Sequence, residues 1–122
     1  MLDLQAALMG NPPKASRREA IRALNDDFRR SFVGGMVLLT DCVAAMPADE
    51  RAELLAAVRD YSLFEYENDP HGEHDLGIVD TGSGRFLWKI DCYDRQLRFG
   101  SPDPADPTVT TRVLTIMRAE EY

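Results

Sequence analysis

The sequence has few of the features that identify a function by themselves. Its 122 residues include only two cysteines and two histidines, and no apolar run is long enough to cross a membrane. The first ten residues contain no basic residue, so we expect no signal peptide and a cytoplasmic protein. Cys42 and Cys92 lie far apart in the chain, without the spacing of a metal site, which predicts two buried thiols rather than a disulfide.

The sequence motifs of common enzymes are also missing. No glycine-rich phosphate loop leads from a predicted strand into a helix, and no serine or cysteine nucleophile motif is present. The sequence therefore favours a non-enzymatic protein, and we expect no cofactor.

Basic residues are absent from one long stretch. The chain has a formal net charge of −7, and residues 60–80 contain seven acidic residues but no Lys or Arg. Neutralisation of phosphates supplies most of the affinity for nucleic acids, so we expect no direct binding to nucleic acid. A protein partner with a basic surface suits this charge better. Solubility alone also explains a negative net charge, and that alternative stays open.

The chain length predicts one domain. Residues 1–15 are expected to be weakly ordered, because Gly10-Asn11-Pro12-Pro13 interrupts them, and residues 16–122 are expected to form the domain. Ser16 and Glu19 have the spacing of a capping box, which predicts a helix start. Four arginines of this helix suggest either a binding face or a solvated face, and the acidic balance of the chain favours the solvated face. They are Arg17, Arg18, Arg22 and Arg29.

The next segments predict short elements. Residues 36–40 have the size and hydrophobicity of a buried strand, and residues 43–45 suggest a single helical turn. A helix is predicted over about 47–60, with Pro47 at its start and acidic residues in its first turn. Phe64 and Tyr66 alternate with Glu65 and Glu67, which predicts an edge strand with an acidic outer face.

A β-hairpin is predicted over residues 74–94. Apolar residues alternate along residues 86–92, and a glycine-rich break at 81–84 separates this run from residues 74–79. Leu76 and Ile78 share a face with Phe86 and Trp88 only if the loop has an odd number of residues. A three-residue loop, 81–83, pairs Ile78 with Phe86 and Leu76 with Trp88.

Charge pairing favours the same loop length. The three-residue loop places Asp75 opposite Lys89, whereas a five-residue loop would place Asp75 opposite Asp91. We therefore expect the three-residue loop.

The last third of the chain predicts two more elements. Leu97 and Phe99 suggest a short strand, and the prolines of residues 100–107 indicate a rigid loop. Residues 107–118 are ambiguous, because their Thr and Val content favours a strand while Val109, Val113, Ile116 and Met117 share a helical face. We expect a helix there.

Together these elements predict an α+β fold. We expect a small antiparallel β-meander of three to five strands packed against two or three helices, in the order α-β-α-β-β-β-(β)-α.

The sequence His71-Gly72-Glu73-His74-Asp75 concentrates side chains that bind metals. Residues three apart in a strand point to opposite faces, so His71 and His74 would not face one ion unless Gly72 bends the chain. His74 shares its parity with Leu76 and Ile78. We therefore expect a histidine at the edge of the core that forms a hydrogen bond, and no metal site.

Carboxylates are expected at one end of the sheet, where Asp91 and Asp94 approach Glu73 and Asp75. Such groups perform acid–base chemistry when burial separates their pKa values. Salt bridges to Lys89, Arg95 or Arg98 are the alternative, and the pattern favours them.

Four segments carry a family resemblance: N-D-P-H-G-E-H-D-L-G (68–77), W-K-I-D-C-Y-D (88–94), G-S-P-D-P-A-D-P (100–107) and T-T-R-V-L-T-I-M (110–117). With them, residues 19–122 resemble an uncharacterised family of small, mostly alphaproteobacterial proteins, a domain of unknown function. Cys92 departs from the aromatic residue expected in relatives. The resemblance implies no catalytic residue. It implies an accessory gene of plasmids and other mobile elements, which suggests an anti-defence role.

Two functions follow as hypotheses. The first is a non-enzymatic acidic protein-interaction module that binds a basic, nucleic-acid-binding surface by imitating phosphates. Its contact residues would be Glu65, Glu67, Asp69, Glu73 and Asp75. The alternative is a small metal-dependent or carboxylate-based enzyme. Its site would comprise His71, Glu73, His74, Asp75 and Asp91.

Overall fold

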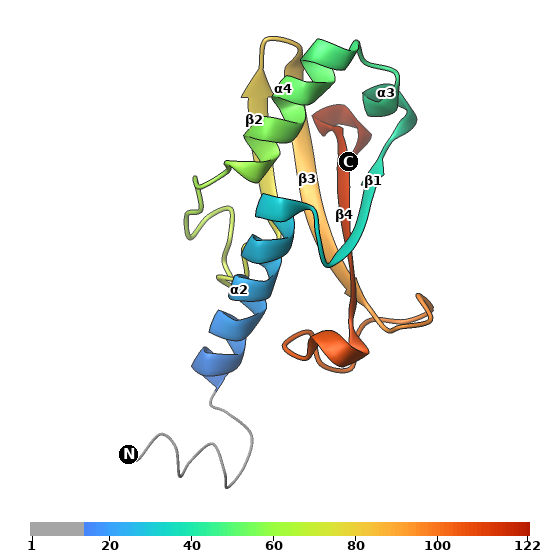
Figure 1. Ribbon diagram of the computed structural model, residues 1–122. Coiled ribbons are helices and arrows are strands. Elements are labelled where there is room, and N and C mark those ends of the chain that lie inside the picture. The colour runs from blue at the N-terminus through green and yellow to red at the C-terminus, as the bar shows by residue number, and fades with distance from the viewer. Residues whose placement is uncertain (1–13) are drawn as a thin grey trace, which may run out of the picture.

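The protein is a four-stranded mixed β-sheet with helices on one face (Figure 1). A computed structural model describes residues 14–122. The elements are α2 (Lys14–Ser31), β1 (Gly35–Leu39), α3 (Asp41–Ala44), α4 (Ala48–Arg59), β2 (Leu76–Thr81), β3 (Gly84–Tyr93) and β4 (Thr111–Arg118), with 3-10 turns at Pro107–Val109 and Ala119–Glu121. The predicted α+β class is confirmed.

The strand order is β1-β4-β3-β2. β4 lies antiparallel to β3, which lies antiparallel to β2, whereas β1 and β4 are parallel. The sheet is thus mostly antiparallel, and the parallel β1–β4 pair departs from the expected meander. The chain enters the sheet at one edge, crosses over through α3 and α4 to the opposite edge, and returns strand by strand to β4.

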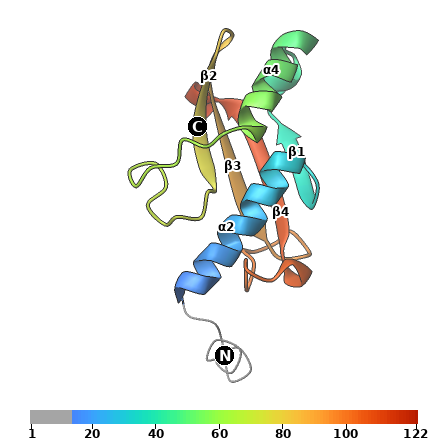
Figure 2. The same cartoon turned by 60° about the vertical axis from the view of Figure 1, so that its left-hand side comes forward.

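The core lies between the sheet and the two long helices. α2 and α4 cover the same face of the sheet in both views (Figures 1 and 2). Phe28 of α2 and Leu54 and Val58 of α4 are buried against Trp88 and Leu114 of the central strands. None of the described helices has the length and hydrophobicity needed to span a bilayer.

Helix α2 differs from the prediction at its start and on one face. It begins at Lys14, so Ser16 lies inside the helix and the predicted cap there is wrong. The expected weak order of residues 1–15 mostly concerns residues 1–13, which lie outside the described residues. Ile21 and Phe28 are buried as the periodicity predicts, but Arg29 is fully buried rather than solvated.

Helix α4 and the preceding turn α3 are confirmed close to their predicted positions. β1 is also confirmed, but it is an edge strand rather than a buried one: Met36 and Leu38 are 42% and 46% exposed. Only alternate residues of β1 face the helices, because the other side of the strand lies on the sheet face that α2 and α4 leave uncovered.

Two predicted short strands are wrong. Residues 64–67 form no strand and belong to a loop, residues 60–75, between α4 and β2. Residues 97–99 also lie in a loop, where Leu97 has a positive φ and Tyr93 forms only a single bridge to Gly100. Alternating residues predict a strand only where a neighbouring strand can accept the hydrogen bonds, and the sequence does not show that neighbour.

The predicted hairpin is confirmed, but its register is wrong. Thr81 pairs with Gly84 across a two-residue loop, so Val79 faces Phe86 and Gly77 faces Trp88. The reason is the size of the indole: a Cβ at Gly77 would lie 2.5 Å from Trp88 Nε1. Glycine therefore occupies the inward position opposite tryptophan, and Ile78 turns outward with 47% exposure.

The C-terminal segment is a strand rather than the predicted helix. β4 lies between β1 and β3, and residues on both of its faces are buried: Val113, Leu114, Ile116 and Met117. A strand with two apolar faces loses its alternation and imitates helical spacing. The local Thr and Val propensity gives the correct answer here.

Both cysteines are free thiols, as expected. Cys42 is exposed, however, and only Cys92 is partly buried, so the prediction of two buried thiols is wrong for Cys42. Burial raises the pKa of the Cys92 thiol above its usual range.

Candidate functional site

Residues 60–75 connect α4 to β2, and we refer to them as the acidic loop. They contain no helix or strand, yet they follow a defined path beside α2 before entering β2 (Figure 2). Loops of this length in a compact domain are uncommon and are usually functional when they are ordered.

Two side chains within the acidic loop fix its shape. Asn68 accepts a hydrogen bond from the Glu65 amide at 2.8 Å and donates to the Leu63 carbonyl at 2.9 Å. Asp69 accepts from the backbone amides of Glu73 and His74 at 3.1 and 3.2 Å. These bonds replace those of a regular element, so the loop satisfies its own backbone groups.

Helix α2 holds the far end of the loop. Arg22 Nε donates to the Gly72 carbonyl at 2.6 Å, and Asn25 Nδ2 donates to the Glu73 carbonyl at 2.9 Å. Gly72 has a φ of +67°, and a Cβ there would lie 3.1 Å from the Arg22 guanidinium. A glycine at this position lets the arginine approach the backbone closely.

His74 connects the loop to the core. Its Nδ1 lies 2.9 Å from Asp26 of α2, and its ring stacks on Phe64 with a centroid distance of 3.7 Å. Because a carboxylate only accepts hydrogen bonds, Nδ1 carries the proton in this contact. The backbone of His74 has a φ of +53°, which is strained for a residue other than glycine and is held by these contacts. The expected hydrogen-bonded histidine at the edge of the core is confirmed.

Arg29 lies beneath the same loop and is completely buried. It donates to Asp26 at 2.9 Å and to the carbonyls of Val58 and Tyr61 at 3.1 and 3.0 Å. Its guanidinium also lies 5.3 Å from the centre of the Phe64 ring. The charge is thus paired and hydrogen-bonded, which is the condition for burying an arginine without a large penalty.

The outer part of the acidic loop remains exposed. Tyr66 and Leu63 are 84% and 69% exposed, and Glu65 and Glu67, which flank Tyr66, are also exposed. An aromatic side chain between carboxylates, on a loop whose base is fixed, presents contact area without a large ordering cost on binding.

A groove lies beside the loop, between the end of α4 and β2. It has a volume of about 420 Å³, and its walls include Leu63 and Ile78 together with Asp60 and Asp80. Ile78 is exposed because of the hairpin register, and Asp80 forms only a surface ion pair with Arg85. The groove therefore combines an apolar floor with two carboxylates, a lining that suits the stem and charge of a Lys or Arg side chain.

The predicted site residues differ in how exposed they are. Glu65, Glu67 and His71 are exposed, whereas Asp69 is buried and bonded within the loop. Glu73 and Asp75 are half-buried. Burial is the main cause that raises the pKa of both carboxyls, and their mutual repulsion raises the pKa of Glu73 further. Of the predicted contact residues, only Glu65 and Glu67 therefore lie freely on the outer surface with ordinary solvation.

The cluster 71–75 does not form a metal-type constellation. Within residues 14–122 no three His, Cys, Asp or Glu side chains converge as a metal site requires. Asp91 pairs with Lys89 on the strand β3, in agreement with the salt bridge that the sequence favours. The His74 ring already binds Asp26 and stacks on Phe64, so it holds the loop in place.

Sequence reasoning missed several residues that build this region. Asp26 and Arg29 were not recognised as the support of the loop, because their partners lie 29 to 48 positions away in sequence. Tyr66 was assigned to a strand, although its unpaired aromatic ring between two glutamates was the available signal. Leu63, Asp60 and Asp80 meet only through the fold.

The comparison with protein families gives one match. The model of a family described as a protein of unknown function, DUF3768, matches residues 39–121. The matched region contains α3, α4, the acidic loop and the strands β2, β3 and β4, but it excludes α2 and all of β1 except Leu39. No curated protein and no solved structure matches the chain. The expected resemblance to a family of unknown function is confirmed, and the chain belongs to that family.

Proposed function

We propose that the protein is a non-enzymatic protein-interaction module and that the acidic loop, with the adjoining groove, is its contact surface. The observation that supports this most is the combination of a rigid base and an exposed outer part. Asp69, His74 and Arg29 fix the loop, while Tyr66 and Leu63 remain largely exposed. Tyrosine is enriched at the energetic centres of interfaces.

The partner we propose is a protein with a basic surface, such as a nucleic-acid-binding protein. Glu65 and Glu67 would take the place of phosphates, and an Arg or Lys of the partner would enter the groove between Asp60 and Asp80. Association of this kind is accelerated by charge and slows steeply as salt is added. We place this interaction in the cytoplasm. The resemblance to a family carried on mobile elements implies an accessory or anti-defence role for this interaction.

The test is capture of the partner from a nuclease-treated host lysate, with the salt concentration raised in steps. We expect one stoichiometric protein that is released at moderate salt and is lost from the variants Tyr66→Ala and Glu65→Gln/Glu67→Gln. The matched control is Asp49→Asn/Glu53→Gln, which removes the same charge from the exposed face of α4 and should retain the partner. A partner that binds all three variants equally, or is insensitive to salt, would contradict the proposal.

A carboxylate enzyme is the second candidate, and one observation favours it. Glu73 and Asp75 both have raised pKa values, and such shifts concentrate at functional sites. We prefer the interaction module, because neither Glu73 nor Asp75 lines the groove beside the acidic loop. An activity lost in Glu73→Gln but retained in Tyr66→Ala would reverse this preference.

A further inference from the structure

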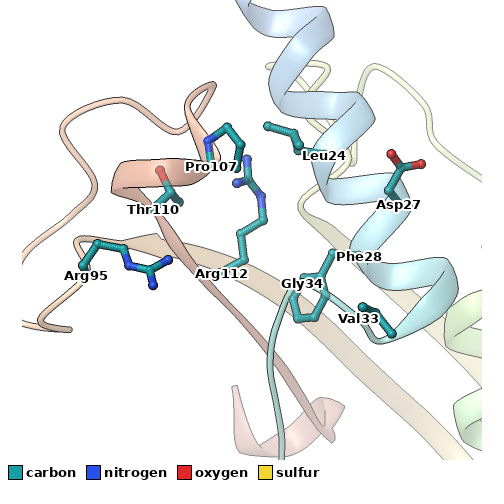
Figure 3. Close-up of a pocket in the computed structure, with 9 residues that line it drawn as sticks. All are labelled: Leu24, Asp27, Phe28, Val33, Gly34, Arg95, Pro107, Thr110 and Arg112. Carbon is teal, nitrogen blue, oxygen red and sulfur yellow. The ribbon is translucent and has the colours of Figure 1, made fainter.

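A second cavity lies on the other side of α2, beneath the loop of residues 94–110. It has a volume of about 180 Å³. Figure 3 shows its two unlike sides: Leu24, Phe28 and Val33 line one side, and Arg112 and Arg95 lie on the other. The two sides come from segments far apart in sequence, and the cavity does not include the acidic loop.

Arg112 of β4 is buried, with 4% exposure. Its Nε donates to Asn25 Oδ1 at 2.8 Å, and its Nη2 donates to the Pro104 carbonyl at 2.5 Å. A guanidinium has five N–H groups, so three remain without a hydrogen bond to the described residues. No described carboxylate forms an ion pair with it. Burial lowers the pKa of Arg112 below its usual range.

No described carboxylate pairs with Arg112, whereas Arg29 in the same core is paired with Asp26. The Nη1 nitrogen of Arg112 forms no hydrogen bond to the described residues and is still reached by solvent, so it can receive a ligand. In Figure 3 Arg95 reaches from its loop toward Arg112, while the Asp27 carboxylate points away from it. Arg95 and Arg112 thus lie on one side of the cavity, while Asp27, which also lines it, lies on the helix side with its carboxylate turned away from the two arginines.

We propose that this cavity binds a small organic acid. The carboxylate would be held by Arg112 and Arg95, and the apolar body would pack against Leu24, Phe28 and Val33. Arginine is suited to this role because its planar donors match a carboxylate in pairs. The proposal is independent of the interaction surface on the acidic loop.

The size of the cavity limits the ligand. An apolar cavity of about 150 Å³ holds one benzene molecule, and pockets for drug-sized ligands start at about 300 Å³. A volume of about 180 Å³ therefore suits a carboxylate on a single ring or a short branched chain and excludes a nucleotide. Inorganic phosphate would fit but would leave the apolar side in contact with water.

Thr110 does not contribute to the recognition. Its hydroxyl is already within hydrogen-bond distance of the Asp103 and Asp106 carbonyls, at 2.9 and 2.8 Å. The two arginines are therefore the determinants of affinity, and Arg95, which is exposed, can be changed without disturbing the core.

The test is a titration of the full chain with benzoate, its neutral isostere benzamide, and inorganic phosphate, followed by amide-proton NMR. We expect benzoate to shift the signals of the cavity residues and to bind at least about tenfold more tightly than benzamide, the equivalent of one charge-assisted hydrogen bond. Arg95→Gln should weaken benzoate by about tenfold for the same reason. The control Arg85→Gln, an exposed arginine of the hairpin, should bind benzoate as the unchanged protein does.

Three results would overturn the proposal. They are equal binding of benzoate and benzamide, unchanged binding by Arg95→Gln, and tighter binding of phosphate than of benzoate. Arg112→Met is a further variant, expected to abolish binding while the dispersed spectrum of a folded chain is retained. If that variant does not fold, the Arg95→Gln and benzamide comparisons still decide the outcome.

Discussion

The acidic loop and residues 94–110 are both held by helix α2, but the buried arginines beneath them differ in how their charge is paired. α2 holds the acidic loop through Arg22 and Asn25, and it holds residues 94–110 through an ion pair of Arg17 with Asp103. The buried Asn25 also accepts from Arg112 of β4, which in turn donates to the Pro104 carbonyl, so Asn25 contacts the acidic loop directly and residues 94–110 through Arg112.

A buried arginine lies beneath each loop, and the comparison between them is instructive. Arg29 donates to Asp26 and to two carbonyls, so its charge is paired within the structure. Arg112 uses two donors on neutral oxygens and faces a cavity. The same residue type thus supports the fold where a carboxylate pairs with it, and offers a binding site where no described carboxylate does.

The largest effect is expected from Arg29→Met. This change leaves Asp26 without its guanidinium and the Tyr61 carbonyl without that donor, while the Val58 carbonyl keeps only the Tyr61 amide at 3.3 Å. The loss should lower the free energy of unfolding by about 3–5 kcal/mol. Urea denaturation measures the loss. Arg30→Met is the control, since Arg30 is exposed on the same helix and should change stability little. Equal losses of unfolding free energy in both variants would contradict a structural role for Arg29.

Asn25→Ala should have the next largest effect. It leaves the Glu73 carbonyl and one donor of a buried guanidinium unpaired, at a cost of about 2–4 kcal/mol. Hydrogen exchange should become faster in both loops together, because one side chain holds both. The exposed neighbour Asp27→Ala should leave exchange in the acidic loop unchanged. Faster exchange in only one loop would contradict the shared support.

Arg112→Met should cost less than Arg29→Met, about 1–2 kcal/mol. It removes a buried charge that has no carboxylate partner, and it leaves only neutral acceptors unpaired. The same urea experiment provides the comparison. A loss as large as that of Arg29→Met would mean that the two arginines are equally committed to the fold.

The smallest effect is expected from Glu73→Gln and should depend on pH. Burial raises the pKa of Glu73 above the usual 4.5, so its ionised form opposes folding. The glutamine variant should be slightly more stable than the unchanged protein at pH 7. The difference should vanish as the pH falls through the raised pKa to below about 4.5, where the carboxyl is protonated in both states. A variant that is less stable at pH 7 would contradict this sign.

Local patterns predicted much of the fold. The stripe of Leu54 and Val58 located α4, and the alternation of Phe86, Trp88 and Ile90 located β3 with its correct inward face. These features succeed because each element buries one face against one neighbour.

The remainder depended on contacts between distant residues. The hairpin register was decided by the volume of Trp88, which only Gly77 can accommodate, and not by the hydrophobicity of Ile78. β4 was predicted to be a helix because a central strand buries both faces. The Asp26–Arg29 pair is local, at i, i+3 on one helix, but the burial of Arg29 required knowing that the Val58 and Tyr61 carbonyls face it. The burial of Arg112 likewise required knowing that Asn25 faces it, and no local pattern contains that information.

The most direct test of the comparison is proton exchange at the arginine side chains, observed by NMR. We predict slow exchange at the Arg29 guanidinium, which is fully buried and paired with Asp26, and fast exchange at Arg112 Nη1, which forms no hydrogen bond to the described residues. Benzoate should slow exchange at Arg112 and leave Arg29 unchanged. Arg112 protons as protected as those of Arg29 in the ligand-free protein would contradict the account.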